Sequence, residues 1–269
     1  MSREPQTQPF QTNIGWGREP WWLLSVPLLA LVFRISPAQI WENLQTPQVY
    51  EAIRISLTTT AITTIVSILF GTPVAYLLAR RQVPFRPFID TLIDLPIVLP
   101  PAVAGVALLI AFGRRGLVGT YLTDFGIDIA FSQVAVIMAQ TFVAVPFYVK
   151  AAALGFGAVD RELEQAAAID GANTWQVFRR VTLPLAWTAL ISGGVMTWAR
   201  ALGEFGATIL FAGNFPGRTQ TMPLAIYIGF ELDLDIALTL AVIMVGLSFL
   251  VLLIVKGLLN RELYTVGGK

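Results

Sequence analysis

The chain of 269 residues contains no cysteine and no histidine, and only 13% of its residues are charged. The missing cysteines exclude disulfides and thiol nucleophiles, and the additional lack of histidine excludes the common zinc sites. Without an imidazole, the usual proton relay is also excluded. A formal net charge of +1 provides no basic field that would attract phosphates, so we expect no nucleic-acid partner.

Catalytic motifs are missing as well. There is no Gly-x-x-x-x-Gly-Lys-Ser/Thr loop, so the chain cannot hold the phosphates of ATP in the usual P-loop manner. The sequence also offers no Ser/His, Cys/His or metal-binding constellation. We therefore expect no catalytic residue, no metal site and no cofactor bound by this chain.

Long apolar runs dominate the sequence, in which 55% of residues are hydrophobic and the mean hydropathy is +0.69. A helix that crosses a hydrocarbon core of ~30 Å needs about 20 apolar residues. Five runs fit that requirement, and we interpret a shorter sixth run as a retained first span; they cover residues 55–79, 95–113, 129–149, 181–199, 236–255 and 21–33. The sequence thus predicts an all-α integral membrane protein with about six transmembrane helices.

The rest of the chain divides around these spans into a polar tail (1–19), a transmembrane domain (20–260) and a C-terminal tail (261–269). A Gly- and Pro-containing apolar run at 205–217 indicates a re-entrant or outer-face segment. Lys and Arg are concentrated on one side of the predicted spans, which places both termini in the cytoplasm. That side carries Arg3, Arg18, Arg80, Arg81, Arg86, Lys150, Arg161, Arg179, Arg180, Lys256, Arg261 and Lys269, against Arg34, Arg54, Arg114, Arg115 and Arg218 outside.

One long polar segment, 155–184, interrupts the apolar runs and is predicted to face the cytoplasm. We expect two short helices in it, separated at Gly171, with Asn173 and Gln176 forming a capping box for the second. Trp175 and Phe178 would share one face of that helix, as a knob for a groove on a partner protein. The alternative is an amphipathic loop that packs on its own bundle.

Few polar or helix-breaking residues lie near the spans, and these are the candidates for a translocation pathway. Arg200 and Glu204 are four residues apart and can form an ion pair on one helix face. We expect this pair to have a structural role on the pore side and not to bind the anion directly. Asp90 and Asp94 are better explained as a solvated helix face than as an aspartyl protease dyad. Two groups of candidates remain. The first is the helix-kinking prolines Pro96, Pro100 and Pro101, which could line a pore or simply bend the helix. The second is the outer-loop donors Asn214, Arg218 and Thr219, which could guide an oxyanion or belong to a plain polar connector.

The polar segment resembles the cytoplasmic signature loop of ABC importer permeases, in which Glu-Ala-Ala precedes a Gly and, further on, an aliphatic residue and Leu-Pro. Gln165, Ala166, Ala167, Gly171, Val181, Leu183 and Pro184 occupy the matching positions. Gln165 departs from the pattern, because the carboxylate stands one residue earlier at Glu164. A second stretch, 201–223, resembles the molybdate branch of the molybdate and sulfate permeases.

The resemblance implies a type I ABC importer permease for molybdate or tungstate in a prokaryotic plasma (inner) membrane. It implies two copies of this chain, two ABC ATPase subunits that bind ATP and Mg, and an extracytoplasmic oxyanion-binding protein. The ATPase would be engaged through the matched loop residues, together with Glu164, Ala172, Trp175 and Phe178. The alternatives are a sulfate or thiosulfate permease, and a secondary anion transporter, although we find no internal repeat that would support the latter.

Overall fold

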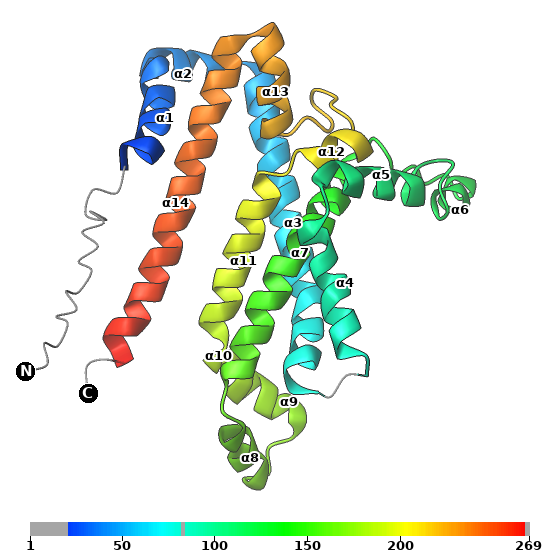
Figure 1. The fold of residues 1–269 in the computed structure, drawn as a ribbon, viewed down its shortest axis with the longest axis vertical. Coiled ribbons are helices and arrows are strands. Elements are labelled where there is room, and N and C mark those ends of the chain that lie inside the picture. Colours follow the sequence, from blue (N-terminus) through cyan, green and yellow to red (C-terminus); the bar gives the residue numbers. More distant parts are fainter. Residues whose placement is uncertain (1–20, 82–83, 267–269) are drawn as a thin grey trace, which may run out of the picture.

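The computed structural model describes residues 21–81 and 84–266, and the predicted polar tail 1–19 lies outside that range. Helices and connecting loops make up the described part of the chain, which contains no strand (Figure 1). The helices are α1 (Trp21–Arg34), α2 (Pro37–Leu44), α3 (Pro47–Arg80), α4 (Arg86–Val98), α5 (Pro101–Phe112), α6 (Gly119–Asp124), α7 (Gln133–Ala158), α8 (Arg161–Ile169), α9 (Thr174–Val177), the π-helical turn η1 (Phe178–Thr182), α10 (Leu183–Leu185), α11 (Trp187–Leu202), α12 (Gly206–Phe211), α13 (Met222–Leu232) and α14 (Leu234–Val266).

Three helices of the described region are long and apolar enough to cross a membrane unbroken, namely α3, α7 and α14. Helices α3 and α14 contain the predicted spans 55–79 and 236–255, and α7 contains the predicted span 129–149 from Gln133 onward, because residues 129–132 precede the helix. The run 21–33 forms α1, whose 14 residues rise only about 21 Å, less than the ~30 Å core. Helix α1 packs along α14. Helix α14 continues to Val266, past the start of the predicted C-terminal tail.

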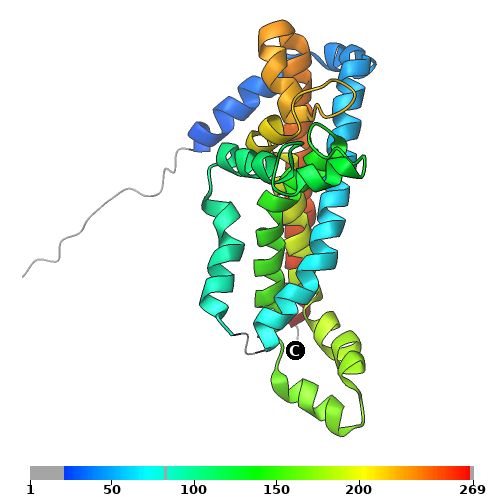
Figure 2. The same cartoon turned by 90° about the vertical axis from the view of Figure 1, so that its right-hand side faces the viewer.

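The predicted single span 95–113 is wrong as a straight helix. Helix α4 ends at Val98, α5 begins at Pro101, and the two helix axes differ by 112°. Pro100 and Pro101 lack backbone N–H groups and restrict the residues before them, so helical bonding cannot continue through this point. Figure 2 shows α5 lying across the molecule above the steeply inclined α4.

The predicted span 181–199 is also divided. The π-helical turn η1 and α10 precede a 69° bend, and α11 starts only at Trp187. The run 205–217 forms the short helix α12 followed by an irregular loop, and α12 packs against α5 and α7. Helix α13 was not predicted from the sequence, because its apolar residues directly follow the Gly- and Pro-containing loop.

Helix α7 lies at the centre of the bundle, between α3 and α11 (Figure 1). Buried polar contacts connect it to α3: the Thr63 hydroxyl donates to the Gln140 amide oxygen at 3.1 Å, and Thr72 and Tyr148 share a hydrogen bond of 2.6 Å. Toward α11 the two backbones approach closely, because a Cβ on Gly155 would lie only 2.4 Å from the Ala189 Cβ. Small residues at a helix crossing permit such an approach within a membrane.

This close approach predicts a position-specific response to adding one methyl group. We expect Gly155→Ala to destabilise the protein by about 1–3 kcal/mol, because the added methyl forces α7 and α11 apart. Gly157→Ala is the matched control, since the same atom at Gly157 meets nothing within 4 Å. In the control, the better helix propensity of alanine should be neutral or stabilising. Midpoints of thermal unfolding in detergent measure both changes, and equal midpoints would contradict the packing argument.

Candidate functional site

The polar segment protrudes from one end of the bundle as the hairpin of α8 and α9 (Figures 1 and 2). The Asp160 carboxylate accepts a hydrogen bond from the Glu162 backbone N–H at 2.9 Å at the start of α8. After α8, Gly171 adopts a φ of +89°, a left-handed conformation that favours glycine. The predicted capping box is confirmed, with Asn173 and Gln176 bonded reciprocally at 2.8 and 2.9 Å.

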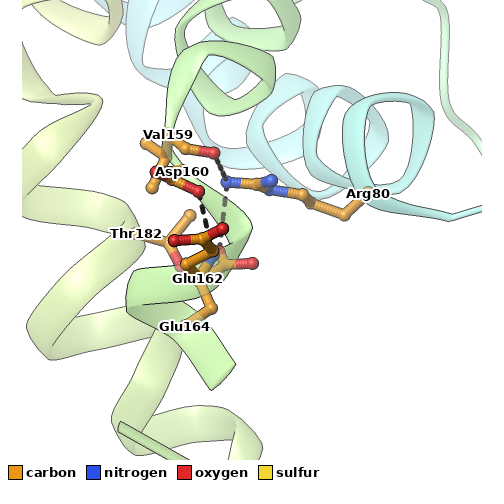
Figure 3. Close-up of polar contacts among 6 residues, drawn as sticks. All are labelled: Arg80, Val159, Asp160, Glu162, Glu164 and Thr182. Carbon is orange, nitrogen blue, oxygen red and sulfur yellow. Dashed lines mark hydrogen bonds and ion pairs between the residues drawn. The ribbon is translucent and has the colours of Figure 1, made fainter. Parts of the chain in front are cut away.

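Glu164 anchors this hairpin to two other parts of the chain (Figure 3). One oxygen of its carboxylate lies 3.2 Å from Nη2 of Arg80, at the end of α3, and accepts a hydrogen bond from the Thr182 hydroxyl at 2.5 Å. The same Arg80 nitrogen donates to the carbonyl of Val159 at 2.8 Å. Because the side chains of Arg80 and Glu164 are only 6% and 18% exposed, water screens this pair weakly.

The remaining loop candidates divide between the surface and the bundle. Gln165, Ala166 and Pro184 are exposed, whereas Ala167, Ala172 and Leu183 are half-buried. Leu183 packs against the apolar cluster around Tyr148 and Phe156. Gln165 stands where the signature pattern has Glu, and the carboxylate of its neighbour Glu164 points inward and binds Arg80 and Thr182.

Trp175 and Phe178 share one face as predicted, with ring centroids 5.6 Å apart in a stacked arrangement. Phe178 also packs edge-on against Tyr76 at 5.1 Å, so this face is turned toward α3 of the same chain. The interpretation as a protruding knob therefore needs correction for Phe178. Besides Trp175, the hairpin has two exposed apolar residues that the sequence did not single out, Leu163 (50% exposed) and Ile169 (85% exposed). Large apolar residues within a polar segment could have indicated a contact surface in the sequence.

Arg200 and Glu204 form the predicted ion pair, with Nη1 and Oε2 2.8 Å apart. The Glu204 side chain is only 1% exposed, and its other oxygen accepts a hydrogen bond from the Ala207 N–H at 2.8 Å. The carboxylate thus links the end of α11 to the start of α12. Pro101 lies at the same junction, because a Cβ on Gly206 would be 2.7 Å from its Cβ. Several pathway candidates distant in sequence are therefore brought together.

The other proline candidates lie along the same bent pair: Pro96 is buried within α4, and Pro100 precedes α5 at the corner. In the outer loop, Arg218 is exposed, but Thr219 is buried, and its hydroxyl accepts a hydrogen bond from the Phe215 N–H at 3.1 Å. Asn214 is half-buried, and its Oδ1 has no hydrogen-bond partner in the described chain. Of these three loop candidates, only Arg218 is an exposed residue.

Asp90 and Asp94 are not simply a solvated face, as their spacing suggested. Lys150 of α7 lies 2.9 Å from the Asp94 carboxylate and 3.8 Å from that of Asp90, and Arg86 lies 3.7 Å from Asp90. The two carboxylates therefore hold α4 against α7. Within the described ranges, no group of three or more His, Cys, Asp or Glu residues could hold a metal ion.

Solved structures with this architecture include chains of ABC transporters. A bacterial transporter for the acidic polysaccharide alginate has a chain that matches 92% of this one over 92% of its own length, with a TM-score of 0.67 and 18% identity. A chain of the MetNI methionine transporter in an inward-facing conformation matches 83% of this chain over 99% of its own, with a TM-score of 0.58 and 20% identity. The fold is that of a type I ABC importer permease.

Sequence comparison identifies nearer relatives. The molybdenum transport system permease protein ModB of Mycobacterium tuberculosis is 43% identical over 86% of this chain and 87% of its own length. ModB of Escherichia coli K12 is 44% identical over 66% of this chain and 78% of its own, and the sulfate permease protein CysT of that strain is 35% identical over 89% and 88%. Residues 67–263 match the family described as "Binding-protein-dependent transport system inner membrane component", and the chain belongs to this family.

Proposed function

We propose that this chain is the membrane-spanning subunit of an ATP-driven importer for molybdate or tungstate. The observation that carries the proposal is the identity of 43% to a permease named for molybdenum transport over most of both chains, against 35% to a permease named for sulfate. Sulfate or thiosulfate is the second candidate, because these are also tetrahedral oxyanions of −2 charge. Membership of the family argues against a gradient-driven transporter and an intramembrane enzyme.

Two copies of the chain would form the pathway, with two ATPase subunits on the cytoplasmic side and an oxyanion-binding protein outside. The end of α14 lies at the same end of the bundle as the α8–α9 hairpin (Figure 1), which is consistent with a cytoplasmic C-terminus. A helix that docks its apolar side chains in a partner's groove is a common recognition mode. Leu163 and Ile169, two exposed apolar residues of α8, would make this contact with the ATPase.

Movement of the docked hairpin would be transmitted to the spans through Glu164. The hydrogen bond between Glu164 and Thr182 connects the hairpin to the bent helix pair that ends in α11, and the ion pair between Glu164 and Arg80 connects it to α3. At the far end of α11, the Arg200–Glu204 pair connects to α12 and the Pro101 corner of α5. ATP binding and hydrolysis would thus shift the relative populations of two arrangements of these helices. In this scheme, Arg200 positions the junction and does not bind the anion.

The transported anion is tested by ATPase activity in proteoliposomes that contain this chain, its ATPase partner and the purified binding protein. We expect the binding protein loaded with molybdate or tungstate to stimulate ATP hydrolysis, because the loaded protein would favour the outward-open arrangement. Binding protein loaded with sulfate should stimulate less. Stimulation by sulfate alone would establish the second candidate, and failure to assemble with any ATPase would refute both.

Removal of the Glu164 carboxylate tests transmission through the hairpin. We expect Glu164→Ala to lower substrate-stimulated ATP hydrolysis about tenfold or more, because losing charge-assisted bonds to Arg80 and Thr182 costs about 1.5–3 kcal/mol. The matched control is Glu162→Ala, in the same helix turn, with an exposed side chain. Co-purification of the ATPase with each variant separates lost assembly from lost transmission. Equal activities of the two variants would contradict the proposed role of Glu164.

Gly171 tests whether the shape of the hairpin matters. Because its φ is +89°, a β-branched residue there is strained by about 1–2 kcal/mol, although nothing lies within 4 Å of a Cβ. We expect Gly171→Val to separate ATP hydrolysis from transport, measured as anion uptake per ATP hydrolysed, without impairing membrane insertion. Gly171→Asn is the control, because asparagine tolerates the left-handed region. An unchanged ratio in Gly171→Val would refute the proposed coupling geometry.

A further inference from the structure

A basic pocket lies between the end of α3 and the α8–α9 hairpin, with a volume of about 340 Å³. Three guanidinium groups line it together with one carboxylate and three neutral hydrogen-bonding side chains; the seven residues are Tyr76, Arg80, Arg81, Arg161, Glu164, Gln165 and Thr174. The four ionised groups sum to +2. Guanidinium groups bind phosphate oxygens through paired hydrogen bonds, so the chemistry of the pocket suits a phosphate group.

Much of the hydrogen-bonding capacity in this pocket is unused. The side chain of Arg80 is 94% buried, yet its Nε has no hydrogen-bond partner in the part of the chain that the structure describes. Arg81 and Arg161 are exposed and form no ion pair within residues 21–81 and 84–266. Arginines of like charge around one pocket repel each other until an anion lies between them.

An apolar groove of about 650 Å³ adjoins the basic pocket. Tyr76 and Thr174 line both, so the two spaces are direct neighbours. The groove is formed by successive turns of α3 and by the hairpin aromatic rings, with Ile68, Leu69, Pro73, Tyr76, Trp175 and Phe178 among its lining residues. Residues 69, 73, 76 and 80 follow each other at intervals of three or four, so a single face of α3 passes from apolar to basic.

We propose that these two adjoining spaces bind one anionic phospholipid, with its phosphate between the arginines and an acyl chain in the groove. Basic residues at the cytoplasmic end of a membrane span attract anionic headgroups. The adjoining apolar groove can hold an acyl chain, which a free oxyanion lacks. Bound lipid would contact both α3 and the hairpin, so the membrane composition would influence coupling. The proposal does not depend on which anion is transported.

The first test is lipid retention by the purified full-length chain, measured by native mass spectrometry after incubation with equal amounts of phosphatidylglycerol and phosphatidylcholine. We expect preferential retention of phosphatidylglycerol. The double variant Arg81→Gln/Arg161→Gln should bind it about 25-fold more weakly, about fivefold for each arginine. The matched control is Arg179→Gln/Arg180→Gln, which removes two exposed arginines of the same loop that do not line the pocket. Equal retention of both lipids, or equal losses in both variants, would refute the site.

A second measurement locates the acyl chain. Phosphatidylglycerol with brominated chains should quench fluorescence in the wild type more than in Trp175→Phe, because Trp175 lines the groove. Displacement of the lipid by millimolar inorganic phosphate, without any quenching of Trp175, would indicate a free oxyanion site and overturn the proposal. Because the chain has no cysteine, Leu69→Cys provides a unique thiol. Cross-linking of two chains through Cys at that position would show that a second copy fills the groove, and would also overturn it.

Discussion

The Glu164 carboxylate joins three segments that are far apart in the sequence: the start of α8, the end of α3 and the π-helical turn before α11. Without it, the hairpin would be held mainly by Phe178 and by its covalent connections. The low exposure of Arg80 and Glu164 makes their pair stronger than a typical surface salt bridge. The polar hairpin can therefore act as a rigid extension of the bundle, as a subunit that receives force from an ATPase requires.

A buried carboxylate also joins separate helices at the other end of α11. Glu204 is almost fully buried, and its carboxylate is bound both by Arg200 and by the Ala207 N–H. This carboxylate links a broken helix to the short helix that follows, next to the proline corner between α4 and α5. Lys150 performs a comparable role between α4 and α7. These charged residues thus mark connections between helices.

The proposed binding of an anionic lipid follows from how few charged residues this chain contains. With only 13% charged residues, three arginines around one small pocket are a marked concentration, and a single carboxylate does not neutralise them. Because that carboxylate is Glu164, the proposed lipid site and the proposed coupling site share a residue. A lipid that stabilises the Arg80 region would act on the element that transmits movement of the hairpin to α3 and α11.

The helical membrane class, the spans within α3, α7 and α14, the capping box at Asn173 and the pairing of Arg200 with Glu204 could all be predicted from the sequence. These features depend on composition and on neighbours a few residues apart, which helical periodicity makes readable. Other features could not be predicted from the sequence: the 112° corner at Pro100, the inward direction of Glu164 and Phe178, the burial of Thr219 and the Lys150 contacts to Asp90 and Asp94. Each of these depends on a partner from a distant segment or on how far a proline bends the chain, and local sequence specifies neither.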